Sequence, residues 1–403
     1  MMSSRIITKK TVKMRIFLTF TLAVSIIFMS CKKDAAVPNN PAMDTTMVFT
    51  NAKNPFIQYS GRIDFSDPKS PTFWFSGTSI KATFQGPAID VVIQDYSSGG
   101  AQTTNYYNIL IDNALYKVLA VNSSDTLYRV ARNLSNTTHK IEVFKRTESQ
   151  VGGSSFRGFC LQIGGALVAP ANQLTRKIEF IGDSYTCGYG NELAIAAPPT
   201  GNPNTGFHSA NENNYNAWGA IIARDLNAEY HCTAYSGRGL YRNNSGLTTG
   251  TVPSIYNRTN PDNASSTWNT SNYVPDVVVI HLGTNDFAPE QASTPSMVDS
   301  TTFVNTYISF IATLRTNYPS AKIICIRPNS ETDYYPTGFK TLTRMTSYIK
   351  AVTDHFVGTD ANVFYFALTP QSPPYGEDWH PCAATHQSMA TQIESFITTK
   401  AGW

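Results

Sequence analysis

Charge is scarce in this sequence and is nearly balanced. Charged side chains make up 15% of the 403 residues, and 31 basic against 28 acidic residues leave a formal net charge of +3. No basic stripe and no run that interleaves basic with aromatic residues stands out. We therefore expect no nucleic-acid partner, because such a partner requires a clustered positive surface.

Cysteine is also scarce, and its spacing argues against two common motifs. The chain has six cysteines and no C-x-x-C pair, so zinc-binding and redox motifs of that spacing are not supported. Apart from Cys31, they are Cys160, Cys187, Cys232, Cys325 and Cys382. In an oxidising compartment this odd number leaves at least one thiol unpaired, and the sequence assigns no disulfide.

The N-terminal 31 residues predict a secretory signal. Basic residues from Lys9 to Arg15 precede an apolar run from Ile16 to Met29, and Ser30-Cys31 follows. The run is too short to span a bilayer comfortably. A cysteine directly after a small residue resembles the lipobox of bacterial lipoproteins, which implies lipidation of Cys31 and an extracytoplasmic protein. The Lys32-Lys33-Asp34 run that follows indicates an outer-membrane anchor, on the periplasmic face or the cell surface. The alternative is plain secretion with Cys31 incidental.

Two textures of sequence follow the leader. Residues 32–54 have no apolar period and predict a flexible tether. Residues 55–170 contain short alternating segments separated by turn residues, which predict an all-β sandwich of the jelly-roll type. The expected strands lie at 72–75, 80–84, 89–93, 107–111 and 140–144.

Residues 171–403 predict a different architecture. Strand-like apolar runs at 177–181, 277–282, 322–326 and 363–368 are combined with helical periods. One helical face contains Phe303, Tyr307, Phe310, Ile311 and Leu314, and another contains Met389, Ile393, Phe396 and Ile397. Strands alternating with helices indicate a parallel sheet covered on both sides, a three-layer α/β/α domain.

Two candidate motifs follow expected strands early in this domain. The run Glu179 to Ile181 leads into Gly182-Asp183-Ser184, which places a serine hydroxyl where ligands bind in such sheets. The same pattern also fits a serine that only caps a helix. After a strand at 229–233, the turn containing Gly237 could bring a backbone N–H close to a reacting oxygen, although such turns are common.

Two more motifs lie toward the C-terminus. The strand that begins at Val277 ends in Gly283-Thr284-Asn285-Asp286, where Asn285 could donate to an oxyanion or form a local turn. His380, in a loop before the final helix, is the natural base for Ser184 because a neutral imidazole titrates near working pH. The Asp378 carboxylate or a backbone carbonyl could hold the imidazole in its tautomer.

Taken together and in this order, the motifs resemble those of the SGNH, or GDSL-type, hydrolases with their flavodoxin-like domain. The resemblance implies that Ser184 is the nucleophile and His380 the base. It also implies an oxyanion hole made by the Ser184 and Gly237 backbone N–H groups and the Asn285 amide. The rival Gly-x-Ser-x-Gly elbow of α/β-hydrolases is absent, since Thr186 stands at its last position.

The N-terminal domain narrows the resemblance. Gly61-Arg62-Ile63-Asp64, Trp74-Phe75-Ser76-Gly77, 109–112 and Lys145-Arg146-Thr147-Glu148 precede the α/β domain, and this arrangement resembles carbohydrate esterase family 2. That family implies removal of acetyl groups from plant cell-wall polysaccharides such as xylan and glucomannan, often at O-6 of hexoses, without a metal or other cofactor. The expected partner is an acetylated hemicellulose or oligosaccharide.

Several points of the site stay open in the sequence. Many SGNH enzymes place the acid three residues before the histidine, a position that Glu377 occupies here. Some family 2 members place it two residues before, at the position of Asp378, and we prefer Asp378. Candidate sugar-stacking residues near the motifs are Trp379, Tyr185, Trp268 and Phe287. Two other functions remain: a non-catalytic glycan-binding lipoprotein, and a lipid or thioester esterase of the same superfamily.

Overall fold

A computed structural model describes residues 46–170, 174–288 and 297–403, which all lie within one compact unit. The expected signal segment and its Cys31 lie outside the described residues. Within the described residues, none of the helices combines the length and the apolar character that a bilayer crossing requires.

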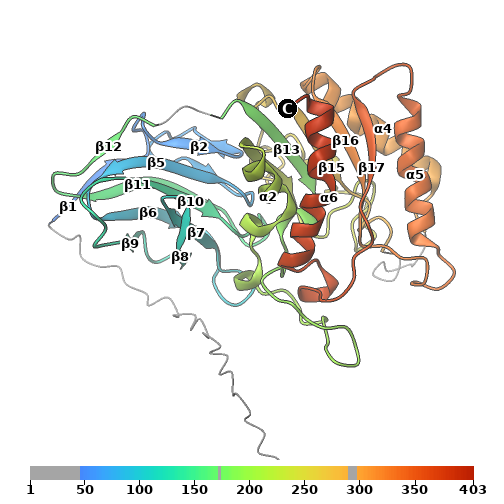
Figure 1. The fold of residues 1–403 in the computed structure, drawn as a ribbon, viewed down its shortest axis with the longest axis horizontal. Coiled ribbons are helices and arrows are strands. Elements are labelled where there is room, and N and C mark those ends of the chain that lie inside the picture. Colours follow the sequence, from blue (N-terminus) through green and yellow to red (C-terminus); the bar gives the residue numbers. More distant parts are fainter. Residues whose placement is uncertain (1–45, 171–173, 289–296) are drawn as a thin grey trace, which may run out of the picture. The chain divides into compact units, whose positions relative to one another are not determined.

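The N-terminal part is a sandwich of two six-stranded sheets whose strand pairs are antiparallel (Figure 1). One sheet has the order β3-β4-β11-β6-β9 with β1 paired to β11, and the other has the order β12-β5-β10-β7-β8 with β2 paired to β5. The strands are β1 (Met47–Asn51), β2 (Gln58–Ser60), β3 (Ile63–Asp64), β4 (Thr72–Phe73), β5 (Ser79–Gln85), β6 (Ile89–Asp95), β7 (Tyr106–Ile111), β8 (Ala114–Ala120), β9 (Leu127–Ala131), β10 (Thr138–Lys145), β11 (Ser154–Gln162) and β12 (Ala166–Val168).

Alternation within these strands builds the core of the sandwich. In β6, Ile89, Val91 and Ile93 are fully buried and pack with Phe156 and Phe159 of β11. Successive side chains of a strand point to opposite faces, so this spacing directs one face of each sheet inward. The jelly-roll-type sandwich expected from the alternating pattern is therefore present.

The first strand corrects the predicted tether. Residues 47–51 were expected to be part of a flexible segment at 32–54, but they form β1, which pairs with β11 from Met47↔Gln162 to Asn51↔Gly158. The physical reason is burial at one end of the strand, where Met47 packs with Ala88 and Cys160. Because Met47 is the one buried side chain of this strand, the sequence shows no alternation of apolar and polar residues from which a strand could be predicted.

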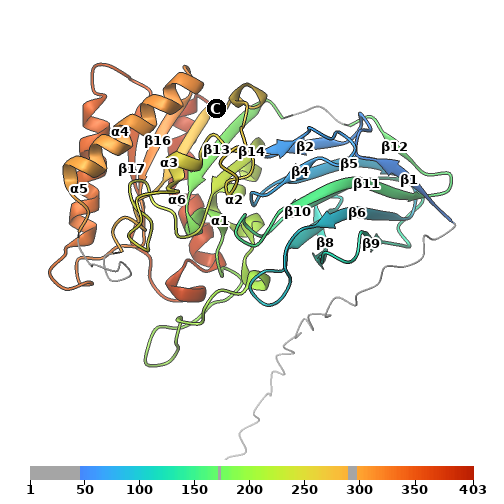
Figure 2. The same cartoon turned by 180° about the vertical axis from the view of Figure 1, so that it is seen from behind.

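The C-terminal part is a three-layer α/β/α domain around a five-stranded sheet of order β14-β13-β15-β16-β17, in which every pair is parallel (Figure 2). The sheet strands are β13 (Arg176–Gly182), β14 (Ala228–Ala234), β15 (Val277–His281), β16 (Lys322–Arg327) and β17 (Val363–Ala367). The helices are α1 (Ser184–Cys187), α2 (Trp218–Asp225), α3 (Val252–Ile255), α4 (Ser300–Asn317), α5 (Thr341–His355) and α6 (Ala383–Ala401).

The two faces of the parallel sheet are covered by different helices. Figure 1 shows α2 and α6 together on one side and α4 and α5 on the other. In α4 the buried side chains are Phe303, Tyr307, Phe310, Ile311 and Leu314, the face predicted from the sequence. In α6, Met389, Ile393 and Ile397 are buried, whereas Phe396 is partly buried.

A buried ion pair joins the sandwich to the α/β domain. The Arg62 guanidinium lies 2.9 Å from the Glu179 carboxylate of β13, and both side chains are almost fully buried. Glu179 also accepts hydrogen bonds from the Tyr256 and Thr233 hydroxyls at 2.7 and 2.8 Å. These neutral donors satisfy a charge that would otherwise be costly to bury.

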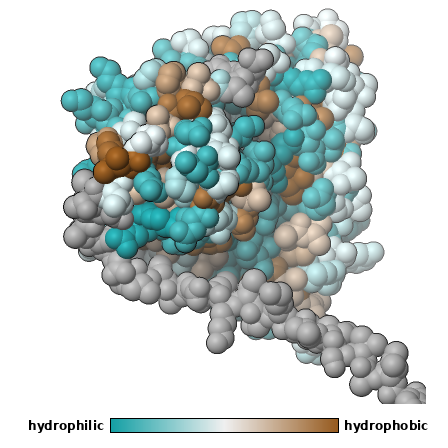
Figure 3. Space-filling model, turned by 60° about the vertical axis from the view of Figure 1, so that its left-hand side comes forward, coloured by the Kyte–Doolittle hydropathy of each residue, from teal (hydrophilic) through white to brown (hydrophobic). Residues whose placement is uncertain are grey.

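The surface seen in Figure 3 is mostly polar, and the described cysteines lie in the interior. The face in Figure 3 is mainly hydrophilic, with separate small apolar patches. Among the described residues, the exposed apolar side chains include Val48 and Phe49 of β1. Each of the five cysteines after Cys31 is a buried free thiol.

Candidate active site

Ser184 occupies the point where the order of the parallel strands reverses. It follows β13, whose neighbours are β14 and β15, so the loops after these strands diverge to opposite faces at its carboxyl end. Ser184 is the first residue of α1, and the Asp183 side chain caps that helix by accepting from Tyr185 N at 3.1 Å. At Gly182 a Cβ would lie 2.0 Å from Thr186 Oγ1, so glycine is required for this sharp entry into the helix.

The structure brings Ser184 and His380 into hydrogen-bond contact. His380 Nε2 lies 2.8 Å from Ser184 Oγ although 196 positions separate the residues in the chain. The other ring nitrogen, Nδ1, lies 3.0 Å from the Glu377 backbone oxygen. A carbonyl can only accept, so it fixes the proton on Nδ1 and leaves Nε2 free to accept the serine proton. Burial of the ring lowers the pKa of His380 to about 4.

The carboxylate predicted to orient His380 lies elsewhere, and this is a correction. Asp378 accepts from the Tyr189 hydroxyl at 2.6 Å and from Gly206 N at 2.9 Å. The backbone explains the difference, because Asp378 (φ 47°) and Trp379 (φ 64°) are both in the left-handed region. That turn carries the Asp378 side chain away from the imidazole and presents a backbone carbonyl instead.

The Glu377 carboxylate, the other acid considered, also has different partners. It accepts from Asn211 Nδ2 at 2.7 Å and lies 2.8 Å from His208 Nδ1. Both partners belong to the long loop between α1 and α2. Glu377 therefore contributes its carbonyl to the site and uses its side chain to hold the neighbouring loop.

The two donors expected for an oxyanion lie in loops after β14 and β15. Gly237 has φ 75°, a conformation that favours glycine. Its backbone N–H has no acceptor within the described ranges. The Asn285 side-chain nitrogen donates to the Arg238 carbonyl at 2.9 Å and lies 3.4 Å from Asp183 Oδ2. Asn285 thus connects the Gly237 loop to the cap of the helix that carries Ser184.

Asp286 fixes the loop that contains Gly237. Its carboxylate accepts from the backbone N–H groups of Leu240, Tyr241 and Arg242 at 2.8, 2.7 and 3.0 Å. Burial raises its pKa to about 6, although these three donors act in the opposite direction. In this irregular segment, the Asp286 carboxylate therefore accepts the backbone hydrogen bonds that a helix or sheet would otherwise satisfy.

The four candidate sugar-stacking residues divide into different environments. Trp379 is 42% exposed beside His380, in a position open to a ligand. Tyr185 is buried beneath the imidazole, with ring centroids 5.2 Å apart. The prediction for Phe287 is wrong, because its ring is fully buried against Phe303. Trp268 is partly buried and packs on Arg62 at the join with the sandwich, so its role in sugar stacking stays a prediction.

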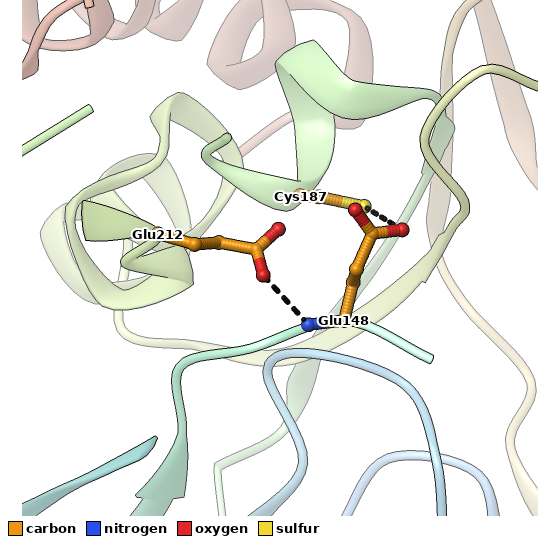
Figure 4. Close-up of side chains that lie close together, drawn as sticks. All are labelled: Glu148, Cys187 and Glu212. Atoms are coloured by element: carbon orange, nitrogen blue, oxygen red, sulfur yellow. Dashed lines mark hydrogen bonds between the residues drawn. The ribbon is translucent and has the colours of Figure 1, made fainter. Parts of the chain in front are cut away.

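The sequence did not predict one buried cluster beside the site. Figure 4 shows Glu148 of the sandwich facing Cys187 of α1 and Glu212 of the loop before α2. One ligand atom from each lies within 4.8 Å of the others, so these residues could geometrically hold a metal ion. The Lys145-Arg146-Thr147-Glu148 string supports the family resemblance, but nothing in the residues around Glu148 indicates that its side chain is buried beside the serine motif.

Comparisons with known proteins agree with this geometry. Residues 59–170 match the model of the carbohydrate esterase 2 N-terminal domain, and residues 180–388 match the GDSL-like lipase/acylhydrolase family. A cellulase/esterase of Acetivibrio thermocellus is 38% identical over 87% of this chain, which spans only 40% of that relative. An acetylxylan esterase / glucomannan deacetylase of Cellvibrio japonicus is 27% identical, over 87% of this chain and 91% of its own.

A solved structure gives the same result for the fold. A family two carbohydrate esterase from Clostridium thermocellum, solved in complex with cellohexaose, is 36% identical with a TM-score of 0.76 and covers 86% of this chain and 99% of its own. The similarity extends over the sandwich and the α/β domain together. This chain therefore belongs to the family 2 carbohydrate esterases.

Proposed function

We propose that this protein is a serine esterase that removes O-acetyl groups from plant cell-wall polysaccharide through an acetyl-serine intermediate. The observation that carries the proposal is the 2.8 Å contact between Ser184 Oγ and His380 Nε2 at the switch point of the parallel sheet. A serine paired with a neutral imidazole is the arrangement that nucleophilic acyl transfer requires.

The geometry supports a two-step reaction. His380 Nε2 takes the Ser184 proton as the oxygen attacks the acetyl carbonyl, and the oxyanion is held by the Ser184 and Gly237 N–H groups with the Asn285 amide. The imidazolium then protonates the departing sugar hydroxyl. Water, deprotonated by the same imidazole, releases acetate and restores Ser184.

The substrate class rests on the relatives and on one exposed side chain. A Cellvibrio japonicus relative is an acetylxylan esterase / glucomannan deacetylase, which favours xylan and glucomannan, with O-6 of hexoses as the expected position. Trp379 is exposed next to His380, where an indole face can stack on a sugar ring while the ester enters.

Acetate release from acetylated xylan and acetylated glucomannan tests the proposal. We expect turnover by the wild-type protein and a loss of at least about 10³-fold in kcat for Ser184→Ala and His380→Ala. Positional NMR of an acetylated oligosaccharide mixture identifies the acetyl group removed. Retention of more than a few percent of activity by Ser184→Ala would refute the nucleophile.

The proposal for location is a lipid anchor on Cys31. Basic residues, the apolar run and Ser30-Cys31 support a lipoprotein, and the Lys32-Lys33-Asp34 run after them favours the outer membrane. A multiply acylated cysteine holds a folded domain firmly at a membrane. Expression with the native leader and labelled palmitate should give a labelled protein in the membrane fraction, and Cys31→Ala should abolish the label. An unlabelled wild-type protein in the medium would favour plain secretion.

A further inference from the structure

We propose that Glu148, a residue of the sandwich domain, is a positioning residue for the reaction: its carboxylate couples the loop of the oxyanion donor Gly237 to the helix that carries Ser184. This inference deepens the proposed function and rests on it. The residue touches neither the serine hydroxyl nor the imidazole, so it acts through the segments it holds.

A single carboxylate oxygen makes both connections. Glu148 Oε2 accepts from the backbone N–H of Ser236 at 2.8 Å, and Ser236 directly precedes Gly237. The same oxygen lies 3.7 Å from the Cys187 Sγ of α1, which donates to it. Ser184 begins this one-turn helix. The contact therefore fixes the nucleophile and an oxyanion donor against a common point.

The hydrogen bonds of the residues on either side of Ser236 go to other segments, so the Ser236 N–H is held by Glu148. Tyr235 N donates to the Gly182 carbonyl at 3.3 Å, and the Gly237 carbonyl accepts from Asn244 N at 3.0 Å. Ser236 lies between these two points, where its N–H has the Glu148 carboxylate as acceptor. The Ser236 N–H belongs to the Tyr235–Ser236 peptide, which directly precedes the peptide that carries the Gly237 N–H. Without that acceptor the Tyr235–Ser236 peptide can rotate, and the resulting change in the Ser236 backbone angles reorients the Gly237 N–H.

Glu148 is itself fixed by burial and by further donors. The residue is fully buried, and its Oε1 accepts from Gln150 Nε2 at 2.8 Å. The Lys145 ammonium donates to the Glu148 carbonyl at 3.3 Å. A buried carboxylate surrounded by donors has one well-defined orientation, as a positioning group requires.

The neighbouring Glu212 differs from Glu148 in its surroundings. Its Oε2 accepts from Glu148 N at 3.0 Å (Figure 4), whereas its Oε1 has no partner within the described ranges. Burial, reinforced by the nearby Glu148 charge, raises the pKa of Glu212 well above its usual value. Burial also raises the pKa of Glu148, but the Ser236 N–H and the Cys187 thiol that donate to its carboxylate act in the opposite direction, which favours the charge of the pair on Glu148.

A metal ion is the competing use of this cluster, and the surroundings disfavour it. A cation held by Glu148, Glu212 and Cys187 would compete for Glu148 Oε2 with the Ser236 N–H and the Cys187 thiol, which already donate to it. It would also lie near the Lys145 ammonium, which interacts favourably with both carboxylates. The positioning role and the metal site predict different responses to substitution.

The test compares Glu148→Leu, Glu148→Gln and Glu212→Gln, with Glu142→Gln on the preceding strand β10 as the matched control. We expect Glu148→Leu to lower kcat at least about 30-fold with KM changed by less than about threefold, because an oxyanion donor acts in the transition state. Glu148→Gln keeps an oxygen acceptor for Ser236 N–H and should recover part of the loss. Glu212→Gln and Glu142→Gln should stay within about threefold of wild type.

A second measurement separates this inference from the proposed function. A p-nitrophenyl phosphonate labels Ser184 Oγ by displacing p-nitrophenolate. Its phosphoryl oxygen is stabilised by the same oxyanion donors, and the reagent contains no sugar ester. The labelling rates should follow the kcat order. If wild type is labelled but releases no acetate, the proposed substrate is wrong, and the labelling rates alone decide on Glu148.

Three results would overturn the inference. The first is labelling of Glu148→Leu within about threefold of wild type. The second is an equal loss in Glu148→Gln and Glu212→Gln accompanied by bound metal in elemental analysis of the wild-type protein, which would assign a metal site. If circular dichroism shows that Glu148→Leu is unfolded, Glu148→Met decides, because its side chain has nearly the same size and no oxygen acceptor for the Ser236 N–H. Wild-type labelling by that variant is the third result.

Discussion

The phenol ring of Tyr189 lies against the imidazole of His380, with ring centroids 4.0 Å apart and planes inclined by 22°. The Tyr189 hydroxyl donates to Asp378 at 2.6 Å, and Asp378 accepts from Gly206 N on the long loop after α1. The imidazole is thus held flat by an aromatic ring and along its edge by the Glu377 carbonyl. Asp378 therefore holds the Tyr189 phenol in place and does not itself hold the His380 imidazole.

Tyr189 should be needed for its ring more than for its hydroxyl. We expect Tyr189→Phe to keep kcat within about threefold, because the stacking surface remains, and Tyr189→Leu to lower it about tenfold or more, because the imidazole gains freedom. Acetate-release kinetics measure both. Equal losses in the two variants would show that the hydrogen bond to Asp378 carries the effect.

Asp378 should contribute far less than the acid of a Ser-His-Asp triad. Removing that acid in such a triad costs about 10⁴-fold in kcat, whereas we expect Asp378→Asn to cost less than about tenfold, since the Glu377 carbonyl holds Nδ1. Steady-state kinetics at saturating substrate provide the measurement. A loss of about 10³-fold or more would mean that Asp378 reaches the imidazole during catalysis.

The pH profile should show an acid limb below that of an ordinary histidine. Burial of the imidazole lowers the pKa of His380 to about 4, and the base must be neutral to accept the serine proton. Protonation therefore abolishes activity only as the pH falls through the lowered value. We expect kcat/KM to keep most of its value at pH 5.5, with an apparent pKa clearly below about 6.5. A limb centred at or above that value would contradict the prediction.

Asn285 should supply transition-state stabilisation. Loss of a comparable side-chain donor costs about 10²–10³ in kcat, or about 3–4 kcal/mol, and we expect Asn285→Ala to fall in this range with KM little changed. The exposed Asn305 of α4 provides the control, Asn305→Ala, which should match wild type. A loss confined to KM would show that Asn285 binds the substrate and not the oxyanion.

Residue periods and motif order were sufficient for the architecture. The alternating segments predicted the sandwich strands β5, β6, β7 and β10, and the helical faces of α4 and α6 were read from their spacing. Each serine-hydrolase motif follows a strand or precedes a helix, and parallel strands end at one edge of their sheet. For that reason the sequence alone predicts that Ser184, Gly237, Asn285 and His380 lie together at one edge of the parallel sheet.

Other features depended on contacts between distant segments. The strand β1 is stabilised by pairing with β11 and not by its own period, and Phe287 faces the core although it follows a site motif. The sequence could not predict which acceptor holds His380 Nδ1. Positive φ values at residues 378 and 379 place the Glu377 carbonyl there instead of a carboxylate, and backbone angles of this kind are not evident from residue type.

The sequence alone determined the two fold classes and predicted the pairing of Ser184 with His380, because hydrophobic period and residue type are local properties of the chain. Only the tertiary structure decided which atom holds the imidazole and that a sandwich glutamate lies against the helix that begins at Ser184. Both depend on backbone turns and on burial between segments far apart in the sequence, and neither leaves a pattern in neighbouring residues.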